Sequence, residues 1–186
     1  MYNVGRDYLN KTLKNVMNEA IAEVQKNGDQ VEVDPSKMAN KDEAARKQSI
    51  DNLKSIASKF LDAILKSIDS CPVPFRVMAN HLQAEVVKRF PDSKYQSVAG
   101  FIFLRFFCPA ILAPDTNGLY GGSLNEKERR LLILVSKVLQ NLANGVDFGN
   151  KEPYMRDLNS FIHETVPQVH KFFDQLVVRY LSECIS

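Results

Sequence analysis

The chain has 186 residues, of which 45% are hydrophobic and 25% are charged, and its formal net charge is +2. This composition is ordinary for a globular protein with a sizeable core, and the absence of a basic block argues against a nucleic-acid-binding protein. The cysteines are three and scattered, at Cys71, Cys108 and Cys184, so neither a disulfide framework nor a zinc site is expected. Reduced thiols and an N-terminus without a signal pattern favour a cytoplasmic protein.

Helical periodicity runs through the first half of the chain. A helix is expected from Tyr8 to Val24, and a longer amphipathic helix from about Asp42 to Ser70, where the Cys71-Pro72-Val73-Pro74 sequence ends it. A third helix is expected from Phe75 to Phe90, stopped by Pro91. The residues expected to face inward are Leu9, Leu13, Val16, Met17, Ala20 and Ile21 in the first helix, Ile50, Leu53, Ile56, Ala57, Phe60, Leu61, Ile64, Leu65 and Ile68 in the second, and Met78, Leu82 and Val86 in the third.

The second half continues in the same way. A central helix falls within Ser97 to Pro114, and a polar surface loop follows from Pro114 to Gly122. The next helix spans Asn125 to Asn144 with a cap near Ser123 or Asn125. A turn at Gly145 and Gly149, a short helix from Pro153 and a last helix from Val166 to Cys184 complete the chain. No stretch alternates with period two for long enough to form a strand, so the prediction is an all-α fold of about six to eight helices in one domain, residues 1–186.

The central helix carries a single charge in an apolar run. Arg105 is the only charged residue between Val98 and Ile111. The eleven-residue apolar run that ends at Cys108-Pro109 is shorter than the roughly 20 residues that a membrane-spanning helix needs, so no membrane insertion is expected. A helix buried on nearly every side is the better interpretation. Because an unpaired buried charge costs several kcal/mol, Arg105 must reach a partner or water, as a side chain that extends to the surface would.

Three blocks of sequence resemble the motifs of a known protein family. Phe103-Leu104-Arg105, followed by Cys108-Pro109-Ala110-Ile111, closely resembles the FLR signature of Ras GTPase-activating (RasGAP) domains. A second block runs from Leu132-Ile133-Leu134-Val135 through Gln140-Asn141-Leu142-Ala143-Asn144, and a third is Phe148-Gly149-Asn150-Lys151-Glu152-Pro153-Tyr154-Met155. Weaker similarity extends from about Tyr8 through Val33-Asp34-Pro35-Ser36-Lys37 to the C-terminal helix. The resemblance implies a domain that binds a Ras-family small GTPase in its GTP-bound state and promotes GTP hydrolysis.

The resemblance also implies roles for individual residues. Gln140 and Asn144 lie four apart on one helix face, where two amides alone could equally be a solvated face or a helix-end cap. In the family these two positions contact the GTPase and its switch region. Lys151 and Leu104, which by themselves would be a solvated charge and a core residue, are also GTPase contacts in the family. Arg105 is implied to hold the backbone of the loop that carries the inserted arginine, because its planar fork offers several fixed donors to carbonyl groups.

The sequence departs from the family at the inserted arginine, the arginine finger. The family's finger loop, an Arg followed by a small-polar and Leu-Ala run, precedes the helix that matches Tyr8 to Val24, and no such segment occurs in these residues. Arg6, flanked by Gly5 and Asp7, does not match the finger pattern. We therefore expect a domain that is incomplete at its N-terminus, either as a truncated form or as a natural chain without the catalytic arginine. Lys94, Tyr95 and Gln96 stand where some members carry a basic partner-contacting residue, which leaves that contact open.

Two functions remain for the chain. The first is a GTPase-activating domain, itself not an enzyme, recruited to membranes through other domains of its parent; the alternative is a GTPase-binding scaffold module without catalytic effect. A helical domain without a GTPase partner is a third hypothesis. No metal or cofactor is expected, because His81, His163 and His170 are far apart in sequence and Gly121-Gly122 lacks the surroundings of a nucleotide-binding loop. Without a finger loop, Arg105 is predicted to face solvent or to pair with a nearby carboxylate or carbonyl.

Overall fold

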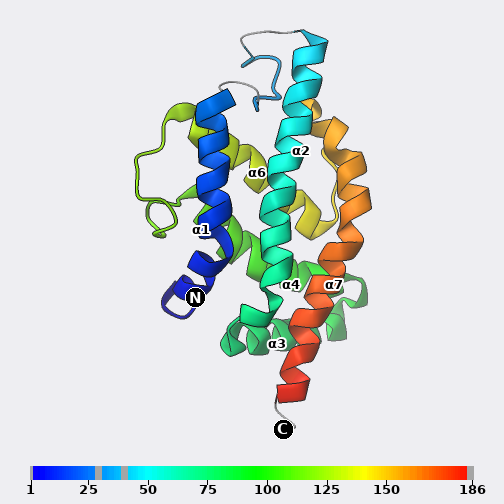
Figure 1. The fold of residues 1–186 in the computed structure, drawn as a ribbon. Helices are drawn as coiled ribbons and strands as arrows, with labels where there is room; N and C mark the ends of the chain where they lie inside the picture. Colours follow the sequence, from blue (N-terminus) through cyan, green and yellow to red (C-terminus); the bar gives the residue numbers. More distant parts are fainter. Residues whose placement is uncertain (1, 28–30, 39–41, 184–186) are drawn as a thin grey trace.

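The computed structural model describes residues 2–27, 31–38 and 42–183, and within these ranges the chain is helical and contains no strand (Figure 1). Three long helices, α1 (Tyr2–Asn27), α2 (Glu43–Lys66) and α7 (Asn159–Glu183), stand side by side. Helices α4 and α6 lie behind them, and α3 crosses below. The predicted all-α fold is confirmed. The remaining elements are η1 (Ser67–Ser70), α3 (Val73–Arg89), η2 (Pro91–Ser93), α4 (Lys94–Ile102), η3 (Phe103–Phe107), α5 (Cys108–Leu112), α6 (Glu126–Asn144) and η4 (Pro153–Leu158).

The first two helices follow the predicted pattern. All six residues expected to face inward on α1 are buried, and on α2 and η1 only Leu65 among the expected residues is no more than half-buried. The helix α1 begins at Tyr2, earlier than the predicted Tyr8, and α2 gives way to a 3-10 turn at Ser67 instead of running to Ser70. Apolar residues at helical spacing therefore identified the buried faces correctly, while the helix ends moved by a few residues.

The predicted inward face of α3 is only partly correct, because Leu82 and Val86 are half-buried but Met78 is not. Met78 is 46% exposed, and the residues buried on α3 are Phe75, Arg76, Ala79 and Gln83. The two long polar side chains turn inward because they satisfy backbone groups there. Arg76 donates from Nη2 to the carbonyl oxygen of Cys71 (2.8 Å), and Gln83 donates to that of Lys94 (3.3 Å).

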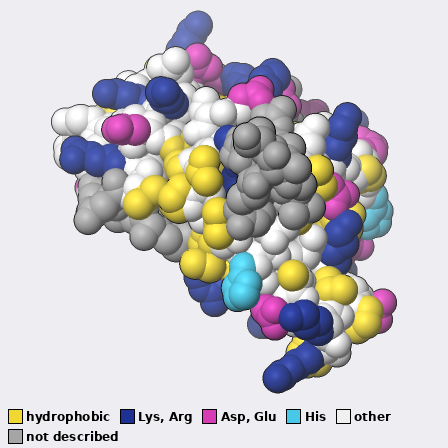
Figure 2. Space-filling model, turned by 90° about the horizontal axis from the view of Figure 1, so that it is seen from below, with side chains coloured by type: hydrophobic (Ala, Val, Ile, Leu, Met, Phe, Trp, Pro, Cys, Tyr) yellow, Lys and Arg dark blue, Asp and Glu magenta, His cyan; other side chains and the backbone are white. Residues whose placement is uncertain are grey.

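The outer side of α3 is apolar as a consequence. Val73, Val77 and Met78 are exposed on it, and Val4 is exposed on α1. Seen from below, hydrophobic side chains gather on this end of the molecule (Figure 2).

The last helix also begins earlier than predicted. Helix α7 starts at Asn159 and contains Pro167, which the sequence analysis placed at the helix start, beside Val166. A proline inside a helix removes one N–H donor and usually marks a helix end. Here the preceding turn is held by packing, because Phe161 and Ile162 are buried and the Thr165 hydroxyl donates to the Phe161 carbonyl (2.6 Å).

The central segment is longer as a helix than its apolar run suggested. The helix is continuous over the 22 residues Pro91–Leu112, and an 18-residue window within it has a mean hydropathy of 1.4, so by length and composition alone it could cross a membrane. The expectation that no segment is long enough to span a membrane is therefore corrected. Elements η2 and α4 lengthen the helix at its N-terminal end with residues more polar than the eleven-residue apolar run. Over half of the apolar window is buried inside the fold, where α4 packs against α3, α6 and α7. This is the environment of a core helix.

Helix α6 has well-defined ends, as predicted. Its N-cap is Asn125, whose side chain accepts from the Glu128 N–H (2.9 Å) while the Glu128 carboxylate accepts from the Asn125 N–H (2.7 Å), a reciprocal capping box. Gln25 of α1 also donates to Glu128 (2.7 Å), which compensates the burial of this carboxylate. At the other end Gly145 adopts a left-handed conformation (φ 63°) that terminates the helix after Asn144.

Candidate functional site

The FLR motif lies in a π-helical turn. In η3 the N–H of Cys108 donates to the carbonyl of Phe103, five residues back, instead of the four of an α-helix. Pro109 follows directly, and a proline in a regular helix would crowd the carbonyl four residues before it, here that of Arg105. The wider turn precedes this proline, and it gives Leu104 and Arg105 a different direction from the α-helical residues around them.

Aromatic anchors on both sides hold this turn. Phe103 is fully buried and packs edge-on against Phe172 and Phe173 of α7, with ring centroids 6.5 and 5.8 Å apart. Phe106 is buried on the opposite side, against Phe75 of α3 (4.7 Å, edge-on) and Tyr8 of α1 (5.9 Å, stacked).

Between these anchors the two intervening side chains are exposed. Leu104 has 36% of its surface exposed, and Arg105 is likewise an exposed residue. An exposed apolar side chain next to an exposed arginine, in a turn otherwise fixed by buried rings, is a rigid presentation of two side chains suited to contacting a partner.

Arg105 pairs with a carbonyl of its own helix. Its Nη1 donates to the carbonyl oxygen of Gly100 at 2.8 Å. The prediction that this arginine faces solvent or pairs with a nearby carbonyl is confirmed. Since a guanidinium carries five N–H donors, this single bond leaves capacity for other acceptors.

The predicted residues on α6 lie beside the FLR segment. Helix α6 packs against η3 and α5, and the thiol of Cys108 donates to the backbone carbonyl of Ser136 on α6 (4.0 Å). Burial raises the pKa of this thiol to about 12, so Cys108 is an inert core residue. Asn144 donates from Nδ2 to the backbone carbonyl oxygen of Gln140 (3.0 Å), and the four-residue spacing places both residues on one helix face.

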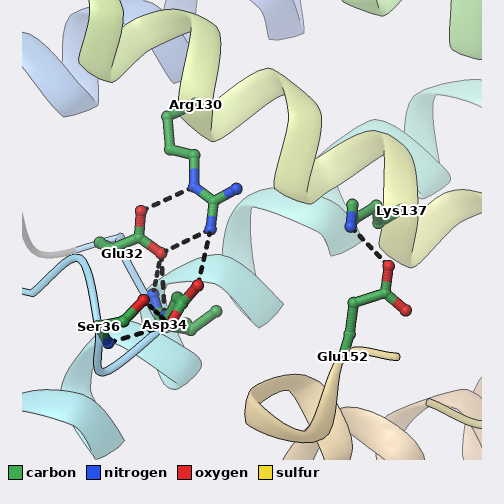
Figure 3. Close-up of polar contacts among 7 residues, drawn as sticks. Glu32, Asp34, Ser36, Arg130, Lys137 and Glu152 are labelled. Atoms are coloured by element: carbon green, nitrogen blue, oxygen red, sulfur yellow. Dashed lines mark hydrogen bonds and ion pairs between the residues drawn. The ribbon is translucent and has the colours of Figure 1, made fainter. Parts of the chain in front are cut away.

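Lys151 is exposed on the segment after α6, and an ion pair fixes that segment. Lys137 of α6 contacts Glu152, the neighbour of Lys151, with 2.6 Å between Nζ and Oε1 (Figure 3). Lys137 precedes Gln140 by three residues and therefore shares its side of the helix. Further along, the side chain of Asn159 forms two hydrogen bonds with the backbone of Phe148. It accepts from the Phe148 N–H (2.8 Å) and donates to the Phe148 carbonyl (3.2 Å).

A second polar cluster, which the sequence analysis missed, joins the 31–38 connection to α6. Arg130 makes a bidentate contact with Glu32 (2.7 and 2.9 Å) and lies 4.0 Å from Asp34 (Figure 3). Glu32 also accepts from the N–H groups of Val33 and Asp34, and Asp34 accepts from the N–H and hydroxyl of Ser36. The signal that could have found it is the pair of acidic residues Glu32 and Asp34 at the Val33-to-Lys37 similarity, which need a cationic partner.

The pKa values in this cluster are shifted in mutually consistent directions. Burial alone would raise the pKa of Glu32, but the hydrogen bonds from Arg130 and from the two N–H groups outweigh it and hold this pKa below its ordinary value. The pKa of Asp34 is lowered in the same way, against burial, by Ser36 and Arg130. Hydrogen bonding to Glu32 raises the pKa of Arg130. The cluster is therefore fully charged near neutral pH.

The residues upstream of the FLR motif are partly committed to internal contacts. Lys94 pairs with Asp174 of α7 (2.6 Å), and Tyr95 donates to the same carboxylate (3.1 Å) while stacking on His170 at 3.8 Å between centroids. Burial lowers the pKa of His170. Lys94 therefore serves to fasten α4 to α7, and Gln96 is exposed.

Arg6 lies within α1, not on a loop. It is exposed, its carbonyl oxygen accepts from the side-chain Nδ2 of Asn10 (3.0 Å), and the neighbouring Gly5 is buried. Cys71 is buried as well, and Cys184 lies outside the described residues. Within the described ranges no group of three or more His, Cys, Asp or Glu side chains is placed to hold a metal ion.

The fold and the site together define an all-α domain that presents Leu104 and Arg105 from a rigid turn, beside the polar end of a neighbouring helix. The family model for RasGAP, described as GTPase-activator protein for Ras-like GTPase, matches residues 39–144. The chain belongs to the RasGAP family.

Curated relatives agree with this assignment. The chain is 38% identical over 177 residues to a probable Ras GTPase-activating-like protein, ngap, of Dictyostelium discoideum, covering 93% of the chain and 20% of that protein. It is 34% identical to human RasGAP-activating-like protein 1 (94% of the chain, 24% of that protein) and 32% identical to human Ras GTPase-activating protein 1 (86% and 15%). The chain thus spans about a quarter or less of the length of these relatives.

Proposed function

We propose that this chain binds a Ras-like small GTPase in its GTP-bound state and, within a protein that supplies an arginine finger, promotes GTP hydrolysis. Membership in the RasGAP family supports a GTPase as the partner. The observation that carries the proposal is the exposure of Leu104 and Arg105 between the buried anchors Phe103 and Phe106.

The proposed contacts follow from the chemistry of each side chain. Leu104 supplies apolar contact to the GTPase, while Gln140, Asn144 and Lys151 supply polar contacts from the end of α6 and the segment after it. Arg105 uses its remaining donors to hold the backbone of the finger loop, because a planar guanidinium can bridge several carbonyl groups. In this role Arg105 touches neither GTP nor the attacking water, so it positions the catalytic arginine.

The reaction itself needs charge stabilisation. During GTP hydrolysis negative charge develops on the oxygen that bridges the β- and γ-phosphates, and an arginine inserted in trans neutralises it. In the Ras–GAP system itself such an arginine is worth about 10³ to 10⁵ in rate. That range corresponds to roughly 4 to 7 kcal/mol of activation free energy. The GTPase is the enzyme, and the proposed role of this domain is to complete its active site.

The alternative is a module that binds a GTPase without accelerating hydrolysis. It requires that no arginine finger reaches the GTPase, and among the described residues Arg6 is not placed as one. This residue lies in a regular helical turn next to a buried glycine, and a finger must reach out from a loop. Both functions use the same Leu104 and Arg105 surface, so binding and rate acceleration must be measured separately.

The experiment that tests the proposal is single-turnover hydrolysis on a GTP-loaded Ras-type GTPase with a large excess of this chain. Binding is measured in parallel with the GDP–aluminium fluoride form, which mimics the transferring phosphoryl group. Binding with little acceleration supports a GTPase-binding surface that depends on a finger from elsewhere. Acceleration of a thousandfold or more would assign the finger to these residues, with Arg6 the first to be replaced. Failure to bind any Ras-type GTPase would overturn the proposal.

A matched pair of variants localises the contact. Leu104→Ala removes an exposed apolar side chain from the proposed surface, and Leu112→Ala removes a comparably exposed leucine (41%) from α5 of the same continuous helix. If Leu104 is a contact residue, its truncation weakens binding by about tenfold, which corresponds to roughly 1.4 kcal/mol, and Leu112→Ala leaves affinity unchanged. Equal effects of both variants would contradict this placement of the interface.

The setting proposed for this activity is the cytoplasm, at membranes to which other parts of a parent protein recruit it. Small GTPases of the Ras type are the proposed partners, and the GTP-bound state is the proposed target. Comparing affinities for GDP-loaded and GTP-loaded GTPase tests the state preference directly. Equal affinity for the two forms would contradict the proposed preference for the GTP-bound state, although the chain would still be a GTPase-binding module.

A further inference from the structure

Gly5 is a buried glycine inside α1, and the backbone does not explain why it is there. Gly5 lies in the first turn of α1 with an ordinary helical backbone that alanine would also adopt, so a packing reason is needed. A Cβ atom added at Gly5 would lie 2.7 Å from Cζ of Phe106 and 2.8 Å from Cζ of Phe75, with Cε2 of Phe106 closer still. Real Cβ atoms are essentially never found below 3.0 Å from such neighbours. At this position α1 therefore approaches the two rings as closely as only a glycine permits.

The rings that meet Gly5 have little room to move. Phe106 is stacked on Tyr8 (centroids 5.9 Å apart, planes 11° apart), lies edge-on to Phe75 (4.7 Å) and contacts Phe107 (5.1 Å). All four residues are buried. Tyr8 is fixed in turn, because its hydroxyl is 2.7 Å from that of Ser67. A methyl group at Gly5 would therefore displace backbone, either of α1 or of the turn that carries Phe106.

That turn is η3, which presents Leu104 and Arg105. Phe106 follows Arg105 directly, and the other anchor of the turn, Phe103, is held by α7. With Phe103 fixed, a displacement of Phe106 changes the direction of the two side chains between them. The contact between Gly5 and Phe106 thus sets the geometry of the exposed pair from a different helix.

We propose that Gly5 is a positioning residue for the GTPase-facing turn: its lack of a side chain seats α1 on Phe106 and so orients Leu104 and Arg105. This inference rests on the proposed function for its effect on binding. Its structural half, the orientation of the turn, is independent of any partner. Gly5 itself contacts no partner in this proposal and acts only through Phe106.

The test compares Gly5→Ala with Gly121→Ala, since an added Cβ at Gly121 meets nothing within 4 Å and the backbone there is not left-handed. The readouts are the methyl resonances of Leu104, the Nε–H resonance of Arg105, and affinity for the aluminium fluoride form of a Ras-type GTPase. Gly5→Ala is expected to shift both sets of resonances and to weaken binding at least tenfold in folded protein. Gly121→Ala changes neither.

Two further variants separate positioning from lost stability. Ile56→Val trims the core on α2 and lowers the melting temperature without touching the turn, so its binding stays at the wild-type level. Replacing Phe106 by Leu in the Gly5→Ala background removes the ring edge that clashes, and it is expected to recover most of the lost affinity. Binding that falls in proportion to melting temperature across all variants would reduce Gly5 to a structural role.

The outcomes also separate this inference from the proposed function. If wild-type protein binds no Ras-type GTPase, the proposed function fails, and the resonances of Leu104 and Arg105 still decide whether Gly5 orients the turn. Unchanged resonances in folded Gly5→Ala protein would overturn the inference even where GTPase binding is intact. Should Gly5→Ala not fold, Phe106→Leu alone, which loosens the same contact, must shift the Leu104 resonances or the inference is wrong.

Discussion

Arg105 donates from Nη1 to the carbonyl of Gly100, five residues earlier in the same continuous helix, at 2.8 Å. The absence of a side chain at Gly100 makes room for this bond, because a Cβ there would lie 3.3 Å from the same Nη1. The guanidinium is therefore folded back along its helix, next to the exposed Leu104. A finger loop that offered better carbonyl acceptors would compete with this single bond.

Gly100→Ala is expected to move the Arg105 side chain without weakening the fold. The new methyl group crowds only the far end of a flexible side chain, and alanine within a helix is more favourable than glycine by roughly 0.5 to 1 kcal/mol. The Nε–H resonance of Arg105 should shift, while the urea midpoint of unfolding stays equal or rises. A lower midpoint with an unshifted Arg105 resonance would contradict the arrangement described here.

Arg130→Met is expected to destabilise the domain by about 1 to 3 kcal/mol, because Glu32 remains largely buried after its cationic partner is lost. The adjacent Arg129 is exposed and gives the matched control, Arg129→Met, which should change stability by no more than about 0.5 kcal/mol. Urea unfolding of both variants measures the difference. Equal effects of the two substitutions would show that the bidentate contact contributes no net stability.

The same cluster makes stability depend on pH. The folded-state pKa values of Glu32 and Asp34 lie below their ordinary values of 4.5 and 3.8, although burial opposes the shift. The unfolded chain therefore binds more protons in acid, and the stabilisation is present above these ordinary values and is lost as the pH falls through the lower folded values. The stability gap between wild type and Arg130→Met should be constant from pH 7 to about 5 and shrink below pH 4. A gap independent of pH would exclude ionisation of this cluster as its source.

The sequence predicted best where burial follows apolar periodicity. The buried residues from Leu9 to Ile21 on α1 were predicted correctly because apolar residues three or four apart share one helix face. A cap near Ser123 or Asn125 was also predicted, and the structure places it at Asn125. The inward face of α3 was only partly predicted because Arg76 and Gln83 are buried by satisfying backbone carbonyls of neighbouring segments. Such compensation depends on tertiary contacts that a helical pattern does not contain.

The geometry of the candidate site could not be predicted from the sequence. The FLR block pointed to Leu104 and Arg105, yet the π-helical turn that exposes them depends on Pro109 and on rings from three other helices. The bidentate contact between Glu32 and Arg130 spans 98 positions, a separation at which no local pattern pairs residues. Gly5 carries no chemical signal in the sequence at all, and only its distance to Phe106 suggested the role proposed for it.

The ion pair between Lys137 and Glu152 is expected to fix the segment that carries Lys151. The two side chains are 32% and 27% exposed, so a coupling free energy of about 0.5 to 1 kcal/mol is expected from a cycle of Lys137→Ala, Glu152→Ala and the double variant. The pair between Lys66 and Asp62, with a longer 3.4 Å contact and 79% and 60% exposure, is the control and should show almost no coupling.

Because Glu152 neighbours Lys151, the same cycle has a second readout in GTPase affinity. Glu152→Ala should weaken binding by releasing the segment, although Glu152 itself carries the wrong charge to replace Lys151 as a contact. In a Lys151→Ala background the effect of Glu152→Ala on affinity should largely disappear, since the residue that the segment positions is gone. If Glu152→Ala weakens binding equally in both backgrounds, Glu152 contacts the partner directly and the ion pair is not the means by which it acts.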